Sequence, residues 1–201
     1  MMLTILSLMR TKPVAYIVAA LVVAELLLML ISWFLSSLMV DGVRSLLSSE
    51  GIRWFFGQFT DMILSPVLGW LLLLAMSSGV LRRSGLLSHP STYRERMNRR
   101  LTLLVLLLYG GMILLLTVIP HAILLSPTGT LFPSPFSRAL VPIIALGILM
   151  VSVVYGISVH VFTSVVDVCQ AMSQGISWWS PILVLYVFFM QFYESVRFVF
   201  F

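Results

Sequence analysis

The sequence predicts an all-α integral membrane protein with about five transmembrane helices and one interfacial amphipathic segment. The first observation is composition: the 201 residues are 60% hydrophobic and only 9% charged, with a mean hydropathy of +1.10. The second is that apolar residues gather in five long runs, and the third is that arginines flank these runs. A soluble protein of this length cannot enclose so much apolar surface, whereas a bilayer accepts it.

Each apolar run is long enough to cross the hydrocarbon layer, which takes about 20 helical residues. Because every backbone amide inside the layer needs a hydrogen-bond partner, each run is expected to be helical. Pro120, late in the third run, predicts a kink or an early end there. We predict one membrane domain, residues 1–201, with spans at 14–40, 63–81, 101–125, 139–162 and 181–201.

The segment 41–61, between the first two runs, mixes apolar and polar residues at helical intervals. This pattern favours one or two interfacial helices that lie on the membrane, with Trp54 at the level of the headgroups. The alternative is an ordinary loop packed on the helix bundle.

The basic residues predict the orientation of the chain. Arg10 and Lys12 precede the first run, and six arginines crowd the link 82–100 between the second and third runs. The positive-inside rule therefore places the N-terminus in the cytoplasm. The basic link is expected to anchor the cytoplasmic face and attract anionic lipid, although a regulatory or partner-binding role is the alternative. The net charge of +5 comes with no groove-reading or stacking motif, so nucleic-acid binding is not expected.

Glu25 is the most unusual residue, because it lies in the interior half of the first apolar run. An ionised carboxylate in the membrane costs several kcal/mol, so such a residue is a functional candidate. It could bind a cation, relay protons or pair across a protomer interface. Alternatively, it is a protonated or hydrogen-bonded side chain that serves only packing.

Two further features of the apolar runs involve specific spacings. Glu194 and Arg197 lie three residues apart in the last run, which favours an internal ion pair over a site for a charged ligand. Small residues four apart predict close helix packing, within a protomer or between protomers. These candidate packing residues are Ala75 and Gly79 in the second run, and Ser152 and Gly156 in the fourth.

Catalysis is not supported by any motif. The chain has no nucleophile elbow, phosphate-binding loop or zinc-helix motif, and its single cysteine, Cys169, excludes a cysteine-cluster metal site. We therefore name no catalytic, cofactor-binding or metal-ligating residue and expect no cofactor. Asp167, in the link before the last run, is a candidate to cap or anchor a short helix.

Two stretches of the chain resemble the AbgT family of p-aminobenzoyl-glutamate transporters. The first, 45–86, carries the "EGIR" phrase at 50–53, Gly79 and the "SGL" phrase at 84–86. The second, 103–192, is longer and carries its phrases in the family's order. These are "SPF" at 134–136, "VPII" at 141–144, "VYGI" at 154–157, Asp167, Val168, Met172 and Ser173, and "FFMQF" at 188–192.

The resemblance implies a bacterial inner-membrane protein that keeps the family's inner scaffold, including helices used for dimer contact. Full-length members also contain two blocks with re-entrant hairpins, which supply their substrate and ion sites. Neither block has a counterpart in this sequence, so no family site residue can be assigned here.

The sequence is compatible with three functions. The favoured one is a structural or partner subunit, a homodimer or the companion of another membrane protein, that does not transport alone. The second is a minimal ion-coupled transporter of p-aminobenzoyl-glutamate, sulfonamides or a similar organic anion. The third is a membrane adaptor of an envelope complex, docking through 82–100 or 41–61.

Overall fold

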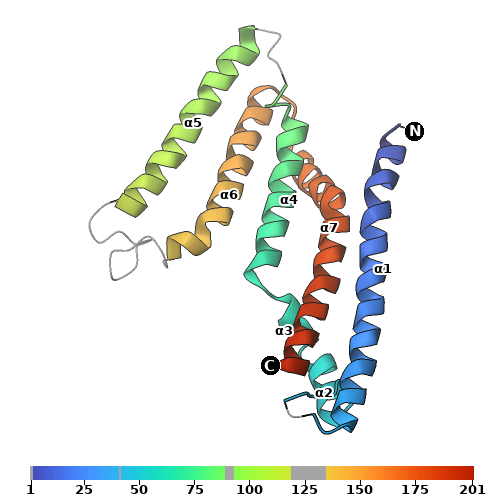
Figure 1. The fold of residues 1–201 in the computed structure, drawn as a ribbon. Helices are drawn as coiled ribbons and strands as arrows, with labels where there is room; N and C mark the ends of the chain where they lie inside the picture. Colours follow the sequence, from blue (N-terminus) through green and yellow to red (C-terminus); the bar gives the residue numbers. More distant parts are fainter. Residues whose placement is uncertain (1, 41, 89–92, 119–134) are drawn as a thin grey trace. The chain divides into compact units, whose positions relative to one another are not determined.

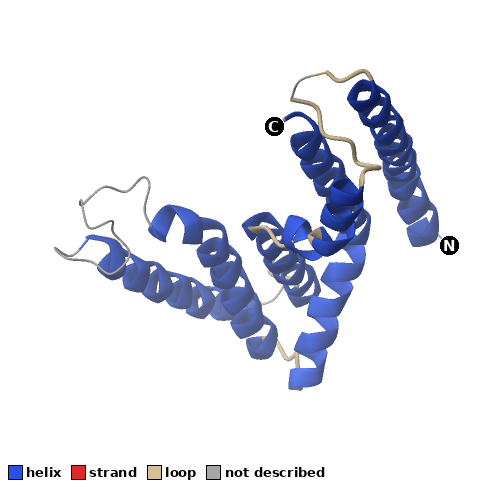
Figure 2. Ribbon diagram, turned by 90° about the horizontal axis from the view of Figure 1, so that it is seen from below, coloured by secondary structure: helices blue, strands red, loops and turns tan. Residues whose placement is uncertain are grey.

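The computed structural model describes residues 2–40, 42–88, 93–118 and 135–201, which form helices and connecting loops with no strand among them (Figures 1 and 2). Five of the described helices, α1 and α4 to α7, are long and apolar enough to cross a membrane. The predicted fold class is confirmed. The helices are α1 (Met2–Ser37), α2 (Ser49–Gly57), α3 (Phe59–Ile63), α4 (Pro66–Ser84), α5 (Tyr93–Val118), α6 (Pro135–Ser158) and α7 (Val165–Phe200).

The chain forms two compact units. Unit 1 comprises Met1–Gly69 with Trp179–Phe201, and unit 2 comprises Trp70–Trp178. Helices α4 and α7 each contribute residues to both units.

Unit 1 pairs α1 with the C-terminal part of α7, and α2 lies beside the ends of both (Figure 1). Its core centres on Leu28 of α1, Leu46 of the connecting loop, and Val199 of α7. The Ser32 hydroxyl donates to the Met29 carbonyl at 2.9 Å and accepts from the Leu46 amide at 3.2 Å. One helical serine thereby ties the loop back to the first span.

The segment 41–61 contains the predicted helices, α2 and the start of α3. Ser48 caps α2, because its side-chain oxygen accepts from the Gly51 amide at 3.0 Å. On one side of α2 the Trp54 ring stacks on Phe198 with a centroid separation of 4.3 Å, while Phe56 is exposed. This two-sided character is typical of a helix at a membrane interface. The interfacial position itself stays a prediction.

In unit 2, α4 and α7 touch backbone to backbone through small residues. A Cβ atom built on Gly79 would lie 2.7 Å from the Gly175 Cα and would collide with the Ala171 carbonyl oxygen. Ala75, one turn earlier, is fully buried. Small residues allow such an approach because van der Waals contact, not the hydrophobic effect, holds helices together in lipid.

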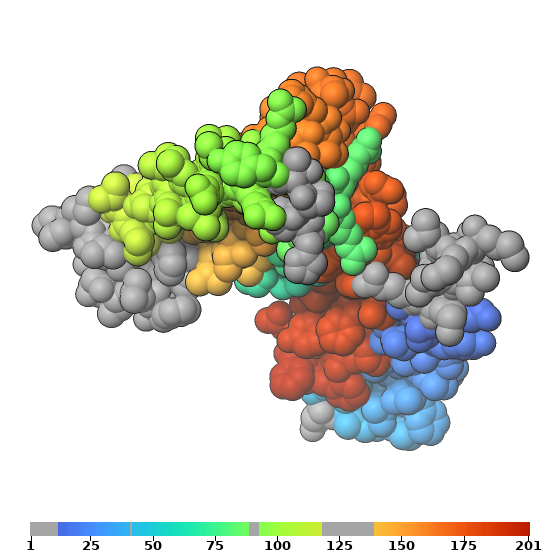
Figure 3. All heavy atoms as spheres, turned by 90° about the horizontal axis from the view of Figure 1, so that it is seen from above, coloured from blue at the N-terminus to red at the C-terminus, as the bar shows by residue number. Residues whose placement is uncertain are grey.

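Helix α5 packs on α6 and leaves most of its other surface uncovered. The Tyr109 hydroxyl of α5 donates to the Ile143 carbonyl of α6 at 2.8 Å, and the Asn98 amide donates to the Ser158 carbonyl at 2.9 Å. Only 6% of the most apolar stretch of α5 is buried in the protein. Figure 3 shows side chains of α5 (yellow-green) uncovered on the face in view. Such a surface is suited to lipid or to another membrane helix.

Helix α7 begins at Val165, so residues 165–180, which we interpreted as a link before the last span, are helical and continuous with that span. The start of the span at 181 stays a prediction. The start of α7 is fixed by a capping box. The Asp167 carboxylate accepts from the Ser164 amide at 3.0 Å and the Thr163 amide at 2.9 Å, while the Ser164 hydroxyl accepts from the Asp167 amide at 3.3 Å. The exposed Cys169 lies one turn beyond this cap.

The first turns of α7 are polar, so the length of the last apolar run does not reveal where the helix begins. With 36 residues, α7 is about 54 Å long, well beyond a hydrocarbon thickness of about 30 Å. Its first turns contain Gln170, Ser173 and Gln174, which lower hydropathy without stopping the helix.

The predicted basic link 82–100 is shorter than expected, because α4 continues to Ser84 and α5 already begins at Tyr93. Gly85, at φ +73°, follows the end of α4 in the left-handed conformation common after a helix. The Arg99 guanidinium donates to the Leu86 carbonyl at 3.0 Å and also to the Ser88 carbonyl. Arg99, one of the six arginines of the predicted basic link, therefore binds the turn that connects α4 to α5. The predicted end of the third span, including Pro120, lies outside the described residues.

The α4–α7 contact leads to a first testable prediction. Gly79→Ala should lower the apparent thermal midpoint of the detergent-solubilised protein by about 3 °C or more. The new methyl group meets backbone atoms that cannot move aside, and overpacking costs about 1–3 kcal/mol. The matched control is Gly69→Ala on the same helix, where a Cβ finds no atom within 4 Å. Equal midpoints for the two variants would contradict the close contact.

Candidate functional sites

A polar cluster inside unit 1 surrounds Glu25, the intramembrane carboxylate singled out by the sequence. The Ser195 hydroxyl of α7 donates to Glu25 Oε1 of α1 at 2.6 Å. The Gln191 side-chain amide donates in turn to Ser195 Oγ at 3.5 Å. Ser195 is fully buried and Gln191 nearly so. We call Glu25, Gln191 and Ser195 the polar cluster.

Two oxygen atoms of the polar cluster have no hydrogen-bond partner. Both Glu25 Oε2 and Gln191 Oε1 are buried from solvent and meet no donor among the described residues. A buried acceptor without a donor costs about 1–3 kcal/mol. The cluster can therefore accept a proton, a cation or a donor group from another molecule, and each of these would remove that cost.

Glu25 was predicted as a candidate, but its partners were not. Gln191 and Ser195 lie four residues apart in the last apolar run, a spacing that puts both on one helix face. That spacing could have drawn attention to them. Which helix faces Glu25 depends on tertiary packing, which the spacing alone does not determine. The functional role of Glu25 stays a prediction.

Glu194 and Arg197 form the ion pair that their spacing suggests. The Arg197 guanidinium lies 3.7 Å from Glu194 Oε1, and its side chain is 66% exposed against 22% for the glutamate. An exposed pair of this kind contributes little to stability. Whether the pair also binds a charged ligand is not tested by this geometry.

The four predicted packing residues have different surroundings. Ala75 and Gly79 lie at the α4–α7 contact described above. Gly156 instead makes room for the ring of Phe162, which follows α6 in the chain and would clash with a Cβ at this position. Ser152 is fully buried and lines a pocket.

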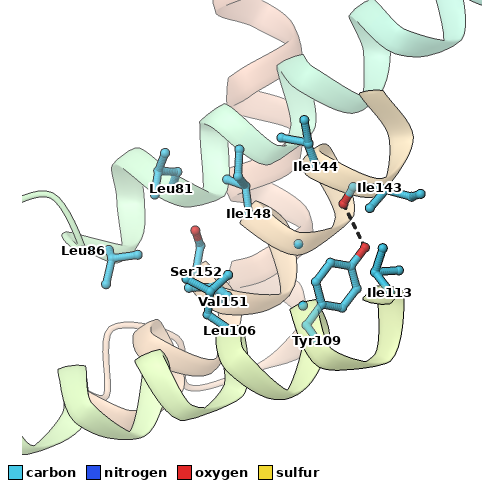
Figure 4. Close-up of a pocket in the computed structure, with 12 residues that line it drawn as sticks. Leu81, Leu86, Leu106, Tyr109, Ile113, Ile143, Ile144, Ile148, Val151 and Ser152 are labelled. Atoms are coloured by element: carbon cyan, nitrogen blue, oxygen red, sulfur yellow. Dashed lines mark hydrogen bonds between the residues drawn. The ribbon is translucent and has the colours of Figure 1, made fainter. Parts of the chain in front are cut away.

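That pocket lies in unit 2, between α5 and α6 with Leu81 and Leu86 at one side (Figure 4). Its volume is about 390 Å³, within the range of small-molecule sites. The lining is almost wholly aliphatic, and its polar side chains are Tyr109 and Ser152. We call it the apolar pocket.

Metal binding finds no support in the described part of the chain, where no three His, Cys, Asp or Glu residues lie close enough to hold an ion. His160 has a structural role at the end of α6. It adopts φ +62° after α6, where its amide donates to the Ile157 carbonyl at 3.0 Å and the Val161 amide donates to the Gly156 carbonyl at 2.8 Å. This pair of bonds is a Schellman motif, which ends the helix.

The second half of the chain is similar to a known family. Residues 102–198 match the sequence model of the AbgT putative transporter family. The match covers just under half of the chain. It includes most of α5, all of α6 and nearly all of α7, and so contributes to unit 2 and to the polar cluster.

The AbgT match confirms the predicted resemblance over the longer of the two stretches, and the protein is a multi-pass, transporter-like membrane protein. The AbgT-like phrases at 45–86 lie outside the matched segment, so that part of the resemblance stays a prediction. No curated protein and no solved structure matches the chain significantly.

The geometry of the polar cluster gives a second prediction. Ser195→Ala should destabilise the solubilised protein by about 1 kcal/mol, because it removes from a buried site the one donor that Glu25 has among the described residues. Thermal unfolding measures the effect. Ser173→Ala is the control on the same helix, since the exposed Ser173 hydroxyl donates only to the carbonyl of Cys169 in its own helix. Equal destabilisation by both variants would show that the Glu25 contact contributes nothing.

Proposed function

We propose that this protein is a membrane scaffold subunit of an AbgT-like transporter assembly, and that it acts as a homodimer or with a partner membrane protein. In this proposal the chain lies in the bacterial inner membrane with its N-terminus in the cytoplasm. The arginines in the last turn of α4 and the first turns of α5 support that orientation through the positive-inside rule.

The observation that carries the proposal is a mismatch between both candidate sites and an organic anion. Carboxylate ligands are held by Arg or Lys side chains or by helix N-termini. The polar cluster is itself acidic and already has two oxygens without donors. The described lining residues of the apolar pocket carry no charge. Neither of these two sites offers the groups that hold an anionic substrate, and in this proposal a partner chain supplies them.

The uncovered apolar surfaces of α1 and α5 are consistent with such an assembly. Only 6% of the most apolar stretch of each of these two helices is buried, whereas the corresponding share is 28% to 33% for α4, α6 and α7. A second helix could pack on either surface, while lipid would cover the remainder.

This proposal predicts no transport by the purified chain alone. Proteoliposomes that contain only this protein, with an inward sodium or proton gradient, should take up p-aminobenzoyl-glutamate no faster than empty liposomes. Native mass spectrometry of the protein as first extracted from its membrane should give a homodimer or a complex with a stoichiometric second polypeptide. Gradient-dependent uptake by a monomer would contradict the proposal.

The polar cluster supports one second candidate, a minimal ion-coupled transporter. Its two buried oxygens without donors, Glu25 Oε2 and Gln191 Oε1, are the kind of groups that a coupling ion would bind. Under this function the proteoliposomes would show uptake, and Glu25 would be essential to it.

For this second candidate, Glu25→Gln should reduce gradient-driven uptake at least about tenfold, because the amide cannot take up or release a proton and attracts a cation weakly. Glu194→Gln is the matched control, since Glu194 pairs with the exposed Arg197. Unchanged uptake in Glu25→Gln would rule out Glu25 as a coupling site.

A further inference from the structure

We propose that the apolar pocket binds a neutral amphiphile, a molecule with an aliphatic body and one hydroxyl or carbonyl group, that enters from the bilayer. This inference goes beyond the proposed scaffold function, because it concerns a ligand that is neither anionic nor transported. It rests on the state of one hydroxyl group, the composition of the pocket wall and the space beside one glycine.

The hydroxyl of Ser152 is the first observation. Serine and threonine side chains inside membrane helices normally bond to a carbonyl of the preceding turn. In α6 itself, Ser158 donates to the Val154 carbonyl at 2.8 Å, and in α5 Thr102 donates to the Asn98 carbonyl at 2.8 Å. Ser152 is fully buried, and its Oγ has no hydrogen-bond partner among the described residues. Figure 4 shows this hydroxyl between Leu81 and Ile148, at the wall of the pocket.

An unused buried hydroxyl is costly unless something in the pocket bonds to it. Leaving such a group without a partner costs about 1–3 kcal/mol. A water molecule needs two to four polar partners, and this pocket offers few. Besides Ser152, its polar side chain is Tyr109, whose proton is already donated to the Ile143 carbonyl at 2.8 Å. A ligand with one hydrogen-bonding group on an apolar body suits this arrangement.

The wall of the pocket defines the class of the rest of the ligand. Leu106, Ile113, Ile144 and Val151 are among its aliphatic lining residues, and none of the lining residues that the structure describes is charged. An anionic or cationic group would lose its hydration here without gaining a partner. The ligand is therefore neutral. Because α4, α5 and α6 are all candidate spans, such a molecule would reach the pocket from the lipid phase.

Glycines on facing helices keep the pocket open. A Cβ on Gly147 of α6 would lie 2.8 Å from Tyr109 Cε1, so this glycine lets the tyrosine ring approach α6. Gly110 of α5 also lines the pocket, and a Cβ there would find no atom within 4 Å. The space beside Gly110 is therefore empty, and a larger side chain can fill it without moving the backbone.

A long-chain alcohol that carries a photoreactive diazirine is the probe for the test. The whole protein, in nanodiscs of phosphatidylcholine, is irradiated with the probe, and the labelled residues are located by mass spectrometry. Labelling should concentrate on the lining residues of α5 and α6 and should decrease when unlabelled decanol competes. Labelling spread evenly over the lipid-facing surface of α5 would overturn the proposal.

Two neighbouring glycines provide a matched pair of variants. Gly110→Leu should reduce the decanol-sensitive labelling at least about fivefold, because the leucine side chain occupies the pocket. Gly111→Leu should leave it unchanged, since Gly111 also has open space around it but does not line the pocket. Both changes place a good helix former in the same helix, so their effects on folding should be similar. Equal labelling of the two variants would overturn the proposal.

Ser152→Ala tests the hydrogen bond separately and does not depend on Gly110→Leu folding well. The variant should bind the alcohol probe about three- to tenfold more weakly, the factor expected for one hydrogen bond. Binding of the corresponding alkane probe, which lacks the hydroxyl, should not change. Equal losses for both probes, or no loss for either, would overturn the proposed hydrogen bond between Ser152 and the hydroxyl group of the ligand. Neither readout depends on transport or on oligomeric state.

Discussion

A lipid bilayer can surround an exposed apolar side chain, but it cannot satisfy a backbone amide that lacks a hydrogen bond. This constraint explains the helical structure of the described part of the chain. Its spans are uninterrupted helices, and α1 and α5 leave most of their apolar surface uncovered. Packing between spans must then come from shape and from a few polar contacts. Ala75, Gly79 and Gly175 supply the shape in unit 2, while Ser195 and Glu25 supply a polar contact in unit 1.

The two candidate sites show two ways in which polar groups can be retained in such a protein. In the polar cluster, an acidic side chain receives one strong donor and keeps one oxygen without a partner. In the apolar pocket, a single hydroxyl remains unused among aliphatic side chains. The first arrangement suits a proton, a cation or a donor from a neighbour. The second suits a neutral molecule that already dissolves in lipid. The AbgT-family segment contributes to both sites.

Sequence alone predicted what depends on length and composition: the helical class, the number of spans, the odd carboxylate at Glu25 and the AbgT resemblance. It misplaced the start of α7, because the Ser164–Asp167 capping box and the polar turns after it continue a helix that hydropathy alone does not detect. It also missed Gln191 and Ser195 as partners of Glu25, because tertiary packing determines which faces of two helices contact each other. The apolar pocket could not be anticipated, because it depends on how three helices lie together around Tyr109 and Ser152.

The exposed thiol of Cys169 gives this chain an unusual experimental convenience. It is the single cysteine of the sequence, and it lies next to the capped N-terminus of the long helix α7. A spin label attached there reports from one defined position, with no need to remove other thiols first. In any symmetric pair of chains, two such labels define a single distance between equivalent α7 helices. The distance between two labels on Cys169 would therefore report how two copies of the chain associate.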